Sequence, residues 1–369
     1  MEVSFVDLNV QYKNLEKEIQ SILKKKFNES QFIGGKEVEK FENNFAKYIH
    51  VKHAVSLNSG TDALILGTRI LDLKPTDEII IPANTFYAAA LAATFNGLKP
   101  VFIDIDSSDF GTNLEDLKRK INSRTKAIIV THLYGQADKI SDIKEIIGKY
   151  SKKIYLIEDS SQAHGALYEG KRVGSFGIFS AFSFYPSKNL GAYGDGGALT
   201  TNDEKIAKKI KLIKEYGQSS KYHHVSIGTN SRLDTIQAAI LNVKLKYLDK
   251  WNKKRQIIAT KYEELLEDVP QVTLPNRFNN RRSIYHLYVI RSKERNSLQK
   301  FLSVSKIKTQ IHYPIPIHLQ KGLSFLKYKK GDLPIVERAA QEILSLPIYP
   351  ELVDQQIHFV AKKIKEFYQ

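Results

Sequence analysis

The sequence predicts an α/β fold with a smaller α+β region at its C-terminal end. Short apolar segments of strand length alternate with helical patterns from about residue 53, which is typical of a sheet covered by helices. The alternation stops near Asp249, and the pattern beyond it is mixed. The chain has 369 residues, which is enough for two domains.

Two helices are expected before the alternating pattern. Residues 7–27 carry apolar side chains at helical spacing, namely Tyr12, Leu15, Ile19 and Ile22. A turn is expected at residues 32–35, FIGG. The helix after it has an apolar face made of Val38, Phe41 and Phe45.

Apolar runs bounded by turn residues predict the strands of the sheet. We expect them at residues 53–57, 78–82, 100–104, 127–131, 153–159, 180–185 and 197–201. The helices between them include an alanine-rich one that runs to Ala93 and one over residues 203–216. Residues 217–229 are expected to form a polar loop before the next helix.

Beyond Asp249 we expect a long charged helix to about Asp268, a strand over residues 285–290 and a helix near Leu298. The last helix carries an apolar stripe of Ile357, Val360, Ile364 and Phe367. The sequence therefore predicts a large domain over residues 1–248, which includes the N-terminal helices, and a small α+β domain over residues 249–369.

Composition limits the classes of function. The net charge of +16 would suit a polyanion, but the lysines are scattered and form no nucleic-acid-binding motif, so we expect no nucleic-acid partner. The absence of cysteine excludes disulfides, thiolate chemistry and cysteine-ligated metals, and we expect no metal site. No apolar run is long enough to span a membrane and the first residues show no signal-peptide pattern, so the cytoplasm is the expected location.

Residues 180–191, SAFSFYPSKNLG, place one amine just beyond a predicted strand. The apolar strand breaks at Pro186, and Lys188 follows in a glycine-rich turn. Burial lowers the pKa of a lysine there and makes its amine a nucleophile that forms imines. In a lysine-rich chain the pattern around an isolated Lys188 favours an ordinary surface residue, so the interpretation depends on its neighbours.

Residues 58–64, NSGTDAL, open a helix directly after a predicted strand. Backbone N–H groups and the helix dipole at such a start attract a phosphate, although an ordinary capped helix has the same pattern. Phe86, after the strand 78–82, could stack on a flat cofactor ring or pack in the core.

Residues 158–165, EDSSQAHG, follow the end of another strand, where α/β sheets bind ligands. Asp159 could pair with a protonated pyridine nitrogen and Gln162 could reach a phenolic oxygen, whereas the alternative for Asp159 is a helix N-cap. His132, after the strand 127–131, is expected to be structural.

A phosphate cup, an aromatic ring, a carboxylate with an amide, and a lysine are together the parts of a pyridoxal phosphate (PLP) site. The lysine would hold the aldehyde as an imine and later move the proton between Cα and the cofactor. The aspartate would keep the ring nitrogen protonated, so that the ring accepts electrons.

These motifs resemble the DegT/DnrJ/EryC1/StrS family of sugar aminotransferases over essentially the whole chain. The motifs are FIGG at 32–35, NSGTDAL at 58–64, EDSSQAHG at 158–165, FSFYPSKNLG at 182–191, GDGGA at 194–198, GTNSRLD at 228–234, QAA at 237–239 and SLPIYP at 345–350. The resemblance implies an aspartate-aminotransferase-like type I PLP fold, with a mixed, mostly parallel sheet between helices and a smaller α+β C-terminal domain.

The resemblance also implies roles for single residues. Lys188 and Asp159 would be catalytic, with Lys188 forming the internal aldimine and Asp159 pairing with the pyridine nitrogen. Gln162 would bind the ring hydroxyl, and Phe86 would lie over the ring, where relatives often have a larger or hydroxylated aromatic. Some relatives with histidine in place of this lysine are dehydratases. Because this chain keeps Lys188, we do not expect that activity here.

The phosphate would be held by Gly60, Thr61 and Ser183. Asn230 would reach the phosphate in the neighbouring subunit, which implies a homodimer with shared active sites.

Residues 228–234 with 312–318, HYPIPIH, resemble most the members that aminate C3 of a dTDP-linked 3-keto-6-deoxyhexose with L-glutamate as donor. The candidate substrate contacts are Tyr185, Tyr193, Lys221, His312, Tyr313 and His318, each of which could also be structural. Two alternatives stay open: amination of a 4-keto nucleotide sugar, and a non-enzymatic regulator on a PLP scaffold. The retention of Lys188, Asp159 and Gln162 argues against the regulator.

Overall fold

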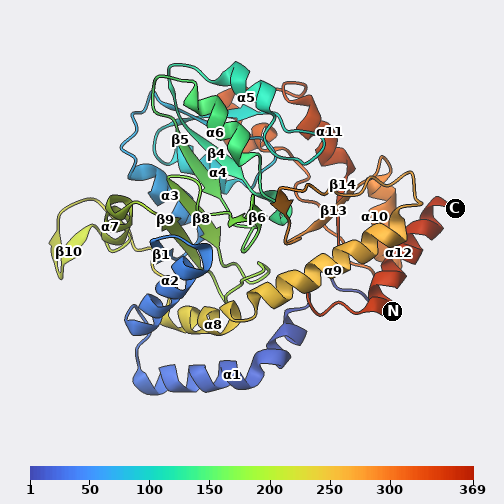
Figure 1. The fold of residues 1–369 in the computed structure, drawn as a ribbon, viewed down its shortest axis with the longest axis horizontal. Helices are drawn as coiled ribbons and strands as arrows, with labels where there is room; N and C mark the ends of the chain where they lie inside the picture. Colours follow the sequence, from blue (N-terminus) through green and yellow to red (C-terminus); the bar gives the residue numbers. More distant parts are fainter.

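The computed structural model describes residues 1–369 and has one large central sheet (Figure 1). Its strand order is β1-β9-β8-β5-β4-β2-β3. The strands are β1 His53–Leu57, β2 Glu78–Pro82, β3 Lys99–Ile103, β4 Thr125–Thr131, β5 Tyr155–Asp159, β8 Phe179–Ser183 and β9 Gly197–Thr201. The neighbours from β3 to β8 pair in parallel and β9 is antiparallel to β1 and β8, so the expected mixed, mostly parallel sheet is confirmed.

The residues of the central strands alternate between two apolar cores, as the side-chain period of a strand requires. Ile79 and Ile81 of β2 enter one core, which also contains side chains of α3, α4 and α7. Ile80 enters the other, with side chains of α5 and α6. These helices are α3 Gly60–Arg69, α4 Ala88–Thr94, α5 Leu114–Lys120, α6 Ile140–Gly148 and α7 Glu204–Ile213. The sheet is therefore covered on both faces.

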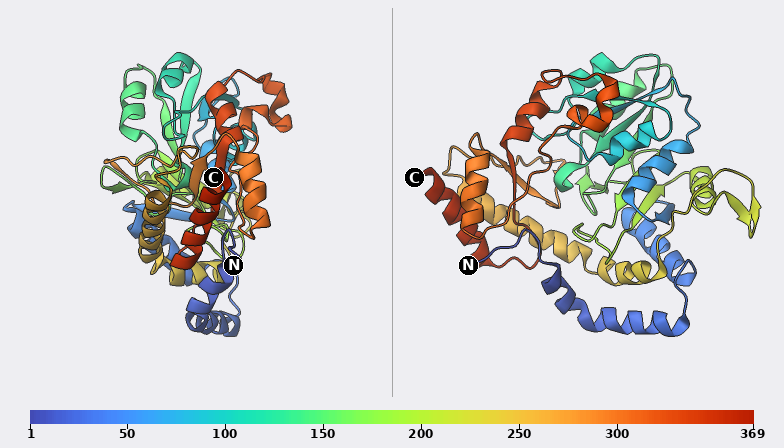
Figure 2. Two further views of the ribbon diagram at one scale, coloured as in Figure 1. Left: turned by 90° about the vertical axis from the view of Figure 1, so that its right-hand side faces the viewer. Right: turned by 180° about the vertical axis from the view of Figure 1, so that it is seen from behind.

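Further helices enclose the sheet from the side of β1. The first is α1 Leu8–Glu29, which lies along α8 Thr235–Leu245 in the views of Figures 1 and 2. The second, α2 Lys36–Ile49, packs Val38, Phe41 and Phe45 against Phe182 and Phe184. The helical pattern in the sequence thus identified the faces that are buried.

The C-terminal part has its own core around a small sheet. It contains α9 Leu248–Leu266, β13 Tyr288–Arg291, α10 Arg295–Val304, α11 Pro334–Glu342, β14 Ile343–Leu346 and α12 Asp354–Tyr368. Val3 belongs to this core, because its backbone pairs with Lys306 and Lys308 at 2.9 Å. The division between residues 248 and 249 stays a prediction. The structure adds that the N-terminal end of the chain packs into the C-terminal part.

Two local expectations were wrong. Residues 217–229 contain a hairpin of β10 Gln218–Ser220 and β11 His223–His224, which is too short and polar to give a strand pattern. The strand expected from residue 285 begins at Tyr288, because Tyr285 has a φ of 44°, which no strand accommodates. Short pairs that the sequence did not predict are β6 Leu167–Tyr168, β7 Lys171–Arg172 and β12 Arg281–Arg282.

None of the helices combines the length and the apolar composition needed to cross a bilayer.

Candidate active site

Lys188 lies in a closed loop between β8 and β9. The loop is pinched at its base, where the Ala192 N–H donates to the Phe184 carbonyl at 2.7 Å, and the Lys188 N–H donates to the Tyr185 carbonyl at 2.8 Å. A Cβ on Gly191 would lie 2.3 Å from the Pro186 carbonyl oxygen, so only glycine closes the loop this tightly.

The Lys188 amine has no hydrogen bond or ion pair with the protein, and it is part-buried. Burial lowers the pKa of Lys188 to about 8, while the negative charge of Asp159 opposes this shift. A fraction of the amine is therefore neutral near pH 7, which is the form that attacks an aldehyde.

Buried histidines surround this amine and are held neutral. Burial, followed by the charge of Lys188, lowers the pKa of His164 to about 3 and that of His312 to about 4. The same two causes bring the pKa of His286 well below its ordinary value. Near neutral pH, Lys188 is thus the basic group of the pocket whose protonation changes.

The two carboxylates at the end of β5 point to opposite faces of the sheet. Asp159 is buried on the side of Lys188, and its Oδ1 accepts from the Ser161 N–H at 3.1 Å. Asp159 therefore caps a turn and starts no helix, because no helix follows it. Glu158 is bound on the other face, where it pairs with the His132 ring at 3.0 Å.

His132 has the structural role expected for it. Its Nδ1 accepts from the Asp138 N–H at 3.0 Å, so its Nε2 carries the proton that is donated to Glu158.

Gln162 connects the end of β5 to the C-terminal part of the chain. Its Oε1 accepts from the Tyr134 N–H at 3.0 Å, and its Nε2 donates to the Tyr313 hydroxyl at 3.1 Å. An amide nitrogen has two hydrogens, so one donor of Gln162 stays available for a ligand. Burial raises the pKa of Tyr313, and the charge of Asp159 adds to this shift, so its hydroxyl stays protonated.

The segment with His312 and Tyr313 closes one side of the site. The Tyr134 hydroxyl donates to the His312 carbonyl at 2.5 Å, and the His312 ring contacts the Ser345 hydroxyl at 2.9 Å. The ring of Tyr313 lies 5.9 Å from that of Phe86 between centroids, and Phe86 is 54% exposed. Phe86 thus presents a free ring face beside Tyr313.

A cavity of about 330 Å³ opens beside the loop that carries Lys188, although Lys188 itself does not line it. Its lining includes Ser187, Tyr185, His312, His286 and Arg255. The two predicted substrate residues in it, Tyr185 and His312, come from the Lys188 loop and from the C-terminal part, so the cavity lies between the two parts of the chain.

The start of α3 lies against the end of β8. A Cβ on Gly60 would come within 2.8 Å of the Ser183 Cβ, and one on Gly197 would lie 2.2 Å from the Ser59 carbonyl carbon. The Ser59 hydroxyl caps the Asp62 N–H at 3.1 Å, which leaves the N–H groups of Gly60 and Thr61 without intrahelical partners. These N–H groups and the Ser183 hydroxyl form a place for a phosphate.

The residues present fit PLP. The amine of Lys188 has no protein partner, Asp159 offers a buried carboxylate, Gln162 keeps a spare N–H, and the N–H groups of Gly60 and Thr61 have no intrahelical partners. These groups are complementary to the aldehyde, the ring nitrogen, the ring hydroxyl and the phosphate of the cofactor.

Comparison with known proteins agrees with this chemistry. The sequence pattern of the DegT/DnrJ/EryC1/StrS aminotransferase family matches residues 13–365. The chain belongs to this family. It is accordingly a PLP-dependent aminotransferase.

Relatives extend the likeness over nearly all of the chain. A "dTDP-3-amino-3,6-dideoxy-alpha-D-galactopyranose transaminase" from Aneurinibacillus thermoaerophilus is 42% identical and covers 99% of both chains. A "Pleiotropic regulatory protein" from Geobacillus stearothermophilus is also 42% identical, over 100% of this chain and 99% of the relative. The crystal structure of DesV from S. venezuelae in complex with ketimine intermediate is 36% identical, covers 100% of this chain and 99% of DesV, and superposes with a TM-score of 0.97.

Two residues predicted to contact substrate in this aminotransferase have other partners. The ring of Tyr193 lies 4.2 Å from the amine of Lys244 and 6.1 Å from the ring of Tyr12. His318 is buried in the C-terminal part, where its Nε2 pairs with Glu337 at 3.1 Å. The structure does not bring His318 to Lys188, since its motif turns inward after Pro316 into a short 3₁₀ helix, Ile317–Leu319.

Lys221 and Asn230 lie on the outside of the chain. Lys221 is in the turn of the β10–β11 hairpin, which projects from the body of the molecule (Figure 1). Asn230 is exposed beside Asn58, while its neighbour Ser231 donates to Asp62 at 2.6 Å. Within one chain neither side chain lines the cavity beside the Lys188 loop.

Two residues around Lys188 were not predicted from the sequence. Tyr134 has a φ of 61° and binds both Gln162 and His312. His286 contacts the Asn189 side chain at 3.1 Å. Tyr134 follows a predicted strand end, which was a usable signal, whereas nothing around His286 distinguishes it in the sequence.

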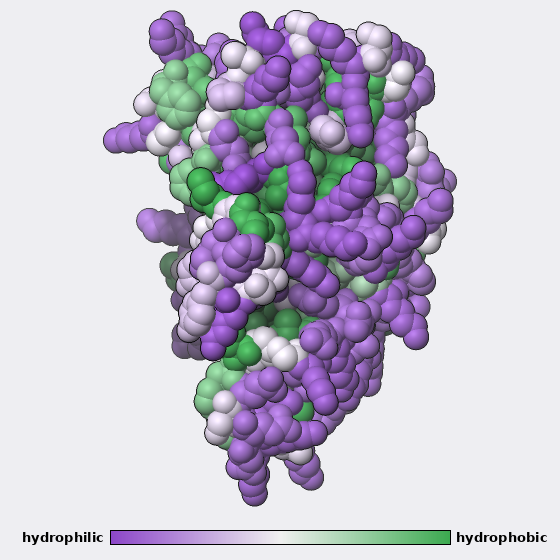
Figure 3. All heavy atoms as spheres, turned by 90° about the vertical axis from the view of Figure 1, so that its left-hand side faces the viewer, coloured by the Kyte–Doolittle hydropathy of each residue, from purple (hydrophilic) through white to green (hydrophobic).

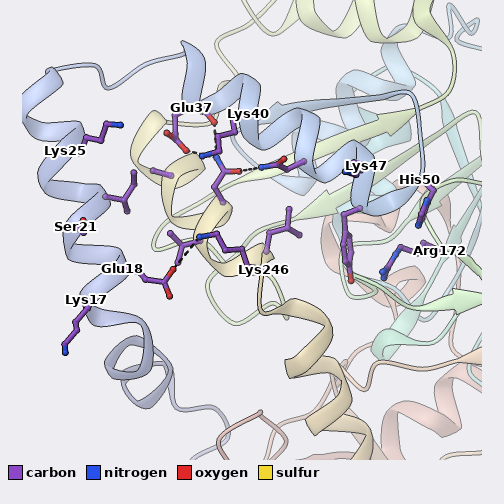
Figure 4. Close-up of a pocket in the computed structure, with 17 residues that line it drawn as sticks. Lys17, Glu18, Ser21, Lys25, Glu37, Lys40, Lys47, His50, Arg172 and Lys246 are labelled. Atoms are coloured by element: carbon purple, nitrogen blue, oxygen red, sulfur yellow. Dashed lines mark hydrogen bonds and ion pairs between the residues drawn. The ribbon is translucent and has the colours of Figure 1, made fainter.

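Of the cavities described, the one with the greatest volume, about 870 Å³, is not at Lys188 (Figure 4). It lies between α1, α2 and α8 and is lined by basic side chains such as Lys17, Lys25, Lys40 and Lys246. Lys246 is paired with Glu18 at 3.5 Å. None of the predicted site residues lines it, so size alone would have located the site wrongly.

Proposed function

We propose that this aminotransferase moves the amino group of L-glutamate to C3 of a dTDP-linked 3-keto-6-deoxyhexose and so forms a dTDP-3-amino-3,6-dideoxyhexose. The observation that carries the proposal is the Lys188 site in a chain that matches a dTDP-3-amino-3,6-dideoxysugar transaminase at 42% identity from end to end.

The residues of the site have separable tasks. PLP, when bound, would supply an electron-accepting ring and an aldehyde carbon that accepts the donor's amino group. The Nζ of Lys188 takes the proton from Cα of the donor, for which its lowered pKa is suited. The carboxylate of Asp159 holds a proton at the ring nitrogen, and Gln162 donates to the ring hydroxyl. Gly60, Thr61 and Ser183 bind the phosphate and fix its position.

The sugar nucleotide is assigned to the cavity between the two parts of the chain. Tyr185 and His312 line it, and their hydroxyl and ring nitrogen atoms suit a polar hexose. Tyr313 follows His312 in the chain and is bonded to Gln162 of the cofactor site. Tyr193 and His318 are left out of this assignment because of their other contacts.

The proposal includes a homodimer in which Asn230 and Lys221 complete the partner's site. Apolar side chains on and near the hairpin are exposed, with Tyr222 at 81% and Ile227 at 88%. Figure 3 views the molecule from the side of the hairpin and shows apolar patches between polar side chains. Exposed apolar groups favour a protein interface, and Lys221 would bring a cation toward the substrate's diphosphate.

Two other functions compete with this one. Amination at C4 would use the same catalytic residues, since only the position of the ketone differs. A regulatory role is favoured by the name of the Geobacillus relative. The unpartnered amine of Lys188 beside a buried carboxylate supports catalysis instead, because a binding scaffold has no need of either.

The test is a two-step absorbance experiment on the purified PLP-loaded protein. L-glutamate should convert the imine absorbance of the bound cofactor to that of its amine form. A dTDP-3-keto-6-deoxyhexose should then restore the first spectrum, and a 4-keto nucleotide sugar should not. Restoration by the 4-keto sugar alone would establish C4 amination, and no response to glutamate would support the regulator.

A further inference from the structure

Helix α8 grips the segment that follows Lys188 with two side chains. Gln237 holds the backbone of Tyr193 in both directions, since its Oε1 accepts from the Tyr193 N–H at 2.8 Å and its Nε2 donates to the Tyr193 carbonyl at 3.3 Å. Lys244 lies two turns further on the same face of the helix. Its amine donates to the Gly191 carbonyl at 2.7 Å.

Lys244 is an unusual residue to find at this position. Its side chain is fully buried, and Gly191 is its one hydrogen-bond partner in the protein. Its amine lies 4.2 Å from the centre of the Tyr193 ring, which compensates part of the lost hydration. Burial lowers the pKa of Lys244 to about 7, against the opposing charge of Glu351.

A buried lysine costs stability, and an apolar side chain would fill the same space without that cost. What an apolar side chain cannot do is bind the Gly191 carbonyl. Lys244 therefore has a specific effect at one place, the end of the loop that carries Lys188.

The other side of this loop is held by α9. Asn189 is buried, and its Nδ2 donates to the Asn252 Oδ1 at 2.8 Å while its Oδ1 contacts His286 at 3.1 Å. Asn189 and Gly191 are thus two fixed points directly after Lys188, and they are attached to different helices. Removing either one takes away one of the two attachments that hold this part of the loop to the surrounding helices.

We propose that Lys244 is a positioning residue for Lys188: by holding the Gly191 carbonyl, it fixes the loop so that the Lys188 amine points into the site. This inference rests on the proposed role of Lys188 in transamination. In this proposal Lys244 touches neither the substrate nor the cofactor.

The chain offers a matched control in Lys120. Its amine also donates to a backbone carbonyl, that of Phe102 at 2.6 Å, and also lies over a tyrosine, Tyr328, at 5.9 Å. Lys120 is at the end of α5, outside the Lys188 loop and the site. Lys120→Met therefore removes the same kind of contact at a place where no effect on Lys188 is expected.

The experiment compares Lys244→Met, Lys244→Arg and Lys120→Met with the unchanged, PLP-loaded full-length enzyme. The first readout is hydrogen exchange at the Lys188 and Ala192 amides, which are bonded inside the loop. The second is the rate of the glutamate half-reaction at saturating glutamate, together with the glutamate concentration that gives half of that rate.

Lys244→Met should raise exchange at both amides and slow the half-reaction about tenfold or more, because small displacements of a reacting group are costly. The half-saturating glutamate concentration should stay within about twofold, since uniform binding is untouched. Lys244→Arg, which keeps a donor, should recover most of the rate, and Lys120→Met should change neither readout.

The inference would be overturned if Lys244→Met kept amide exchange and the half-reaction rate within about twofold of the unchanged enzyme. It would also be overturned if Lys120→Met changed both readouts as much as Lys244→Met does. If Lys244→Met does not fold, Lys244→Leu, which also removes the donor to Gly191, is measured in the same way, with the same expected losses. Lys188→Ala separates the two proposals. If this variant still catalyses transamination, the proposed function fails. If it is inactive while Lys244→Met behaves like the unchanged enzyme, only the positioning role of Lys244 fails.

Discussion

The pocket around Lys188 and the outer segment with the β10–β11 hairpin differ in how their predicted site residues are held. In the pocket, Asp159 and Gln162 are buried and bound to neighbours in the same chain. In the outer segment, Lys221 and Asn230 are exposed, and Ile227 between them is 88% exposed. We attribute this difference to the proposed homodimer, in which one chain builds the chemical half of the site and the outer half forms against a second copy.

The largest effect is expected from removing the amine of the pocket. Lys188→Ala should lower turnover by about 10⁴-fold or more, because both the covalent attachment and the proton transfer depend on it. Steady-state transamination with L-glutamate measures this loss. After borohydride reduction, mass spectrometry of the denatured variant should find no attached cofactor, which confirms the cause. Turnover near that of the unchanged enzyme would remove Lys188 from the mechanism.

The carboxylate of the pocket comes next. Asp159→Asn keeps the size of the side chain but removes its charge, so the half-reaction with glutamate should slow about 10²-fold. The turn should stay intact, since the asparagine oxygen can still accept from Ser161. A thermal midpoint close to that of the unchanged enzyme is the control, and an unchanged half-reaction rate would contradict the role of Asp159.

The pocket should also show a characteristic pH dependence in the cofactor-free enzyme. The pKa of Lys188 is lowered to about 8, so its reactive neutral fraction rises with pH until about 8 and is nearly constant above about 9. The rate of PLP capture should therefore rise about tenfold from pH 6 to pH 7 and level off above pH 9. A rise that continues unchanged to pH 10 would mean an unshifted lysine.

Changes in the outer segment should weaken PLP binding if, as proposed, this segment completes the site of a second subunit. Asn230→Ala should weaken PLP binding about tenfold, because one hydrogen bond to a phosphate is lost. Ile227→Asp should weaken the dimer and lower PLP affinity with it. Sedimentation and PLP titration measure both; a monomeric enzyme with full PLP affinity would show that one chain builds the whole site.

The smallest effect is expected at the tip of the hairpin. Lys221→Ala should raise the KM for the sugar nucleotide about threefold and leave the glutamate half-reaction unchanged, because an exposed ion pair contributes little. Lys208→Ala, which removes an exposed lysine of α7, is the matched control and should leave the KM unchanged. An equal change in both variants would mean a general effect of charge.

The same contrast explains how far the sequence could predict this molecule. Lys188, Asp159 and the start of α3 were predictable, because ligands gather where strands of an α/β sheet end. The roles of Tyr134 and His286 depend on a positive φ and on contacts between distant segments, which leave no local pattern. Tyr193 and His318 were placed by motif alone, and packing against Lys244 and Glu337 determined their surroundings.

The hairpin shows the same limit from the other direction. Its strands are too short for a periodic pattern, and the exposure of Tyr222 in its turn and of Ile227 just after it has no explanation within one chain.

The most direct test of the account follows the nitrogen itself. The enzyme is incubated with ¹⁵N-labelled L-glutamate and a dTDP-3-keto-6-deoxyhexose, and the product is examined by NMR for ¹⁵N bonded to a sugar carbon. We predict the label at C3, and no labelled sugar with Lys188→Ala. Label at C4 from a 4-keto sugar alone, or no labelled sugar with the unchanged enzyme, would contradict it.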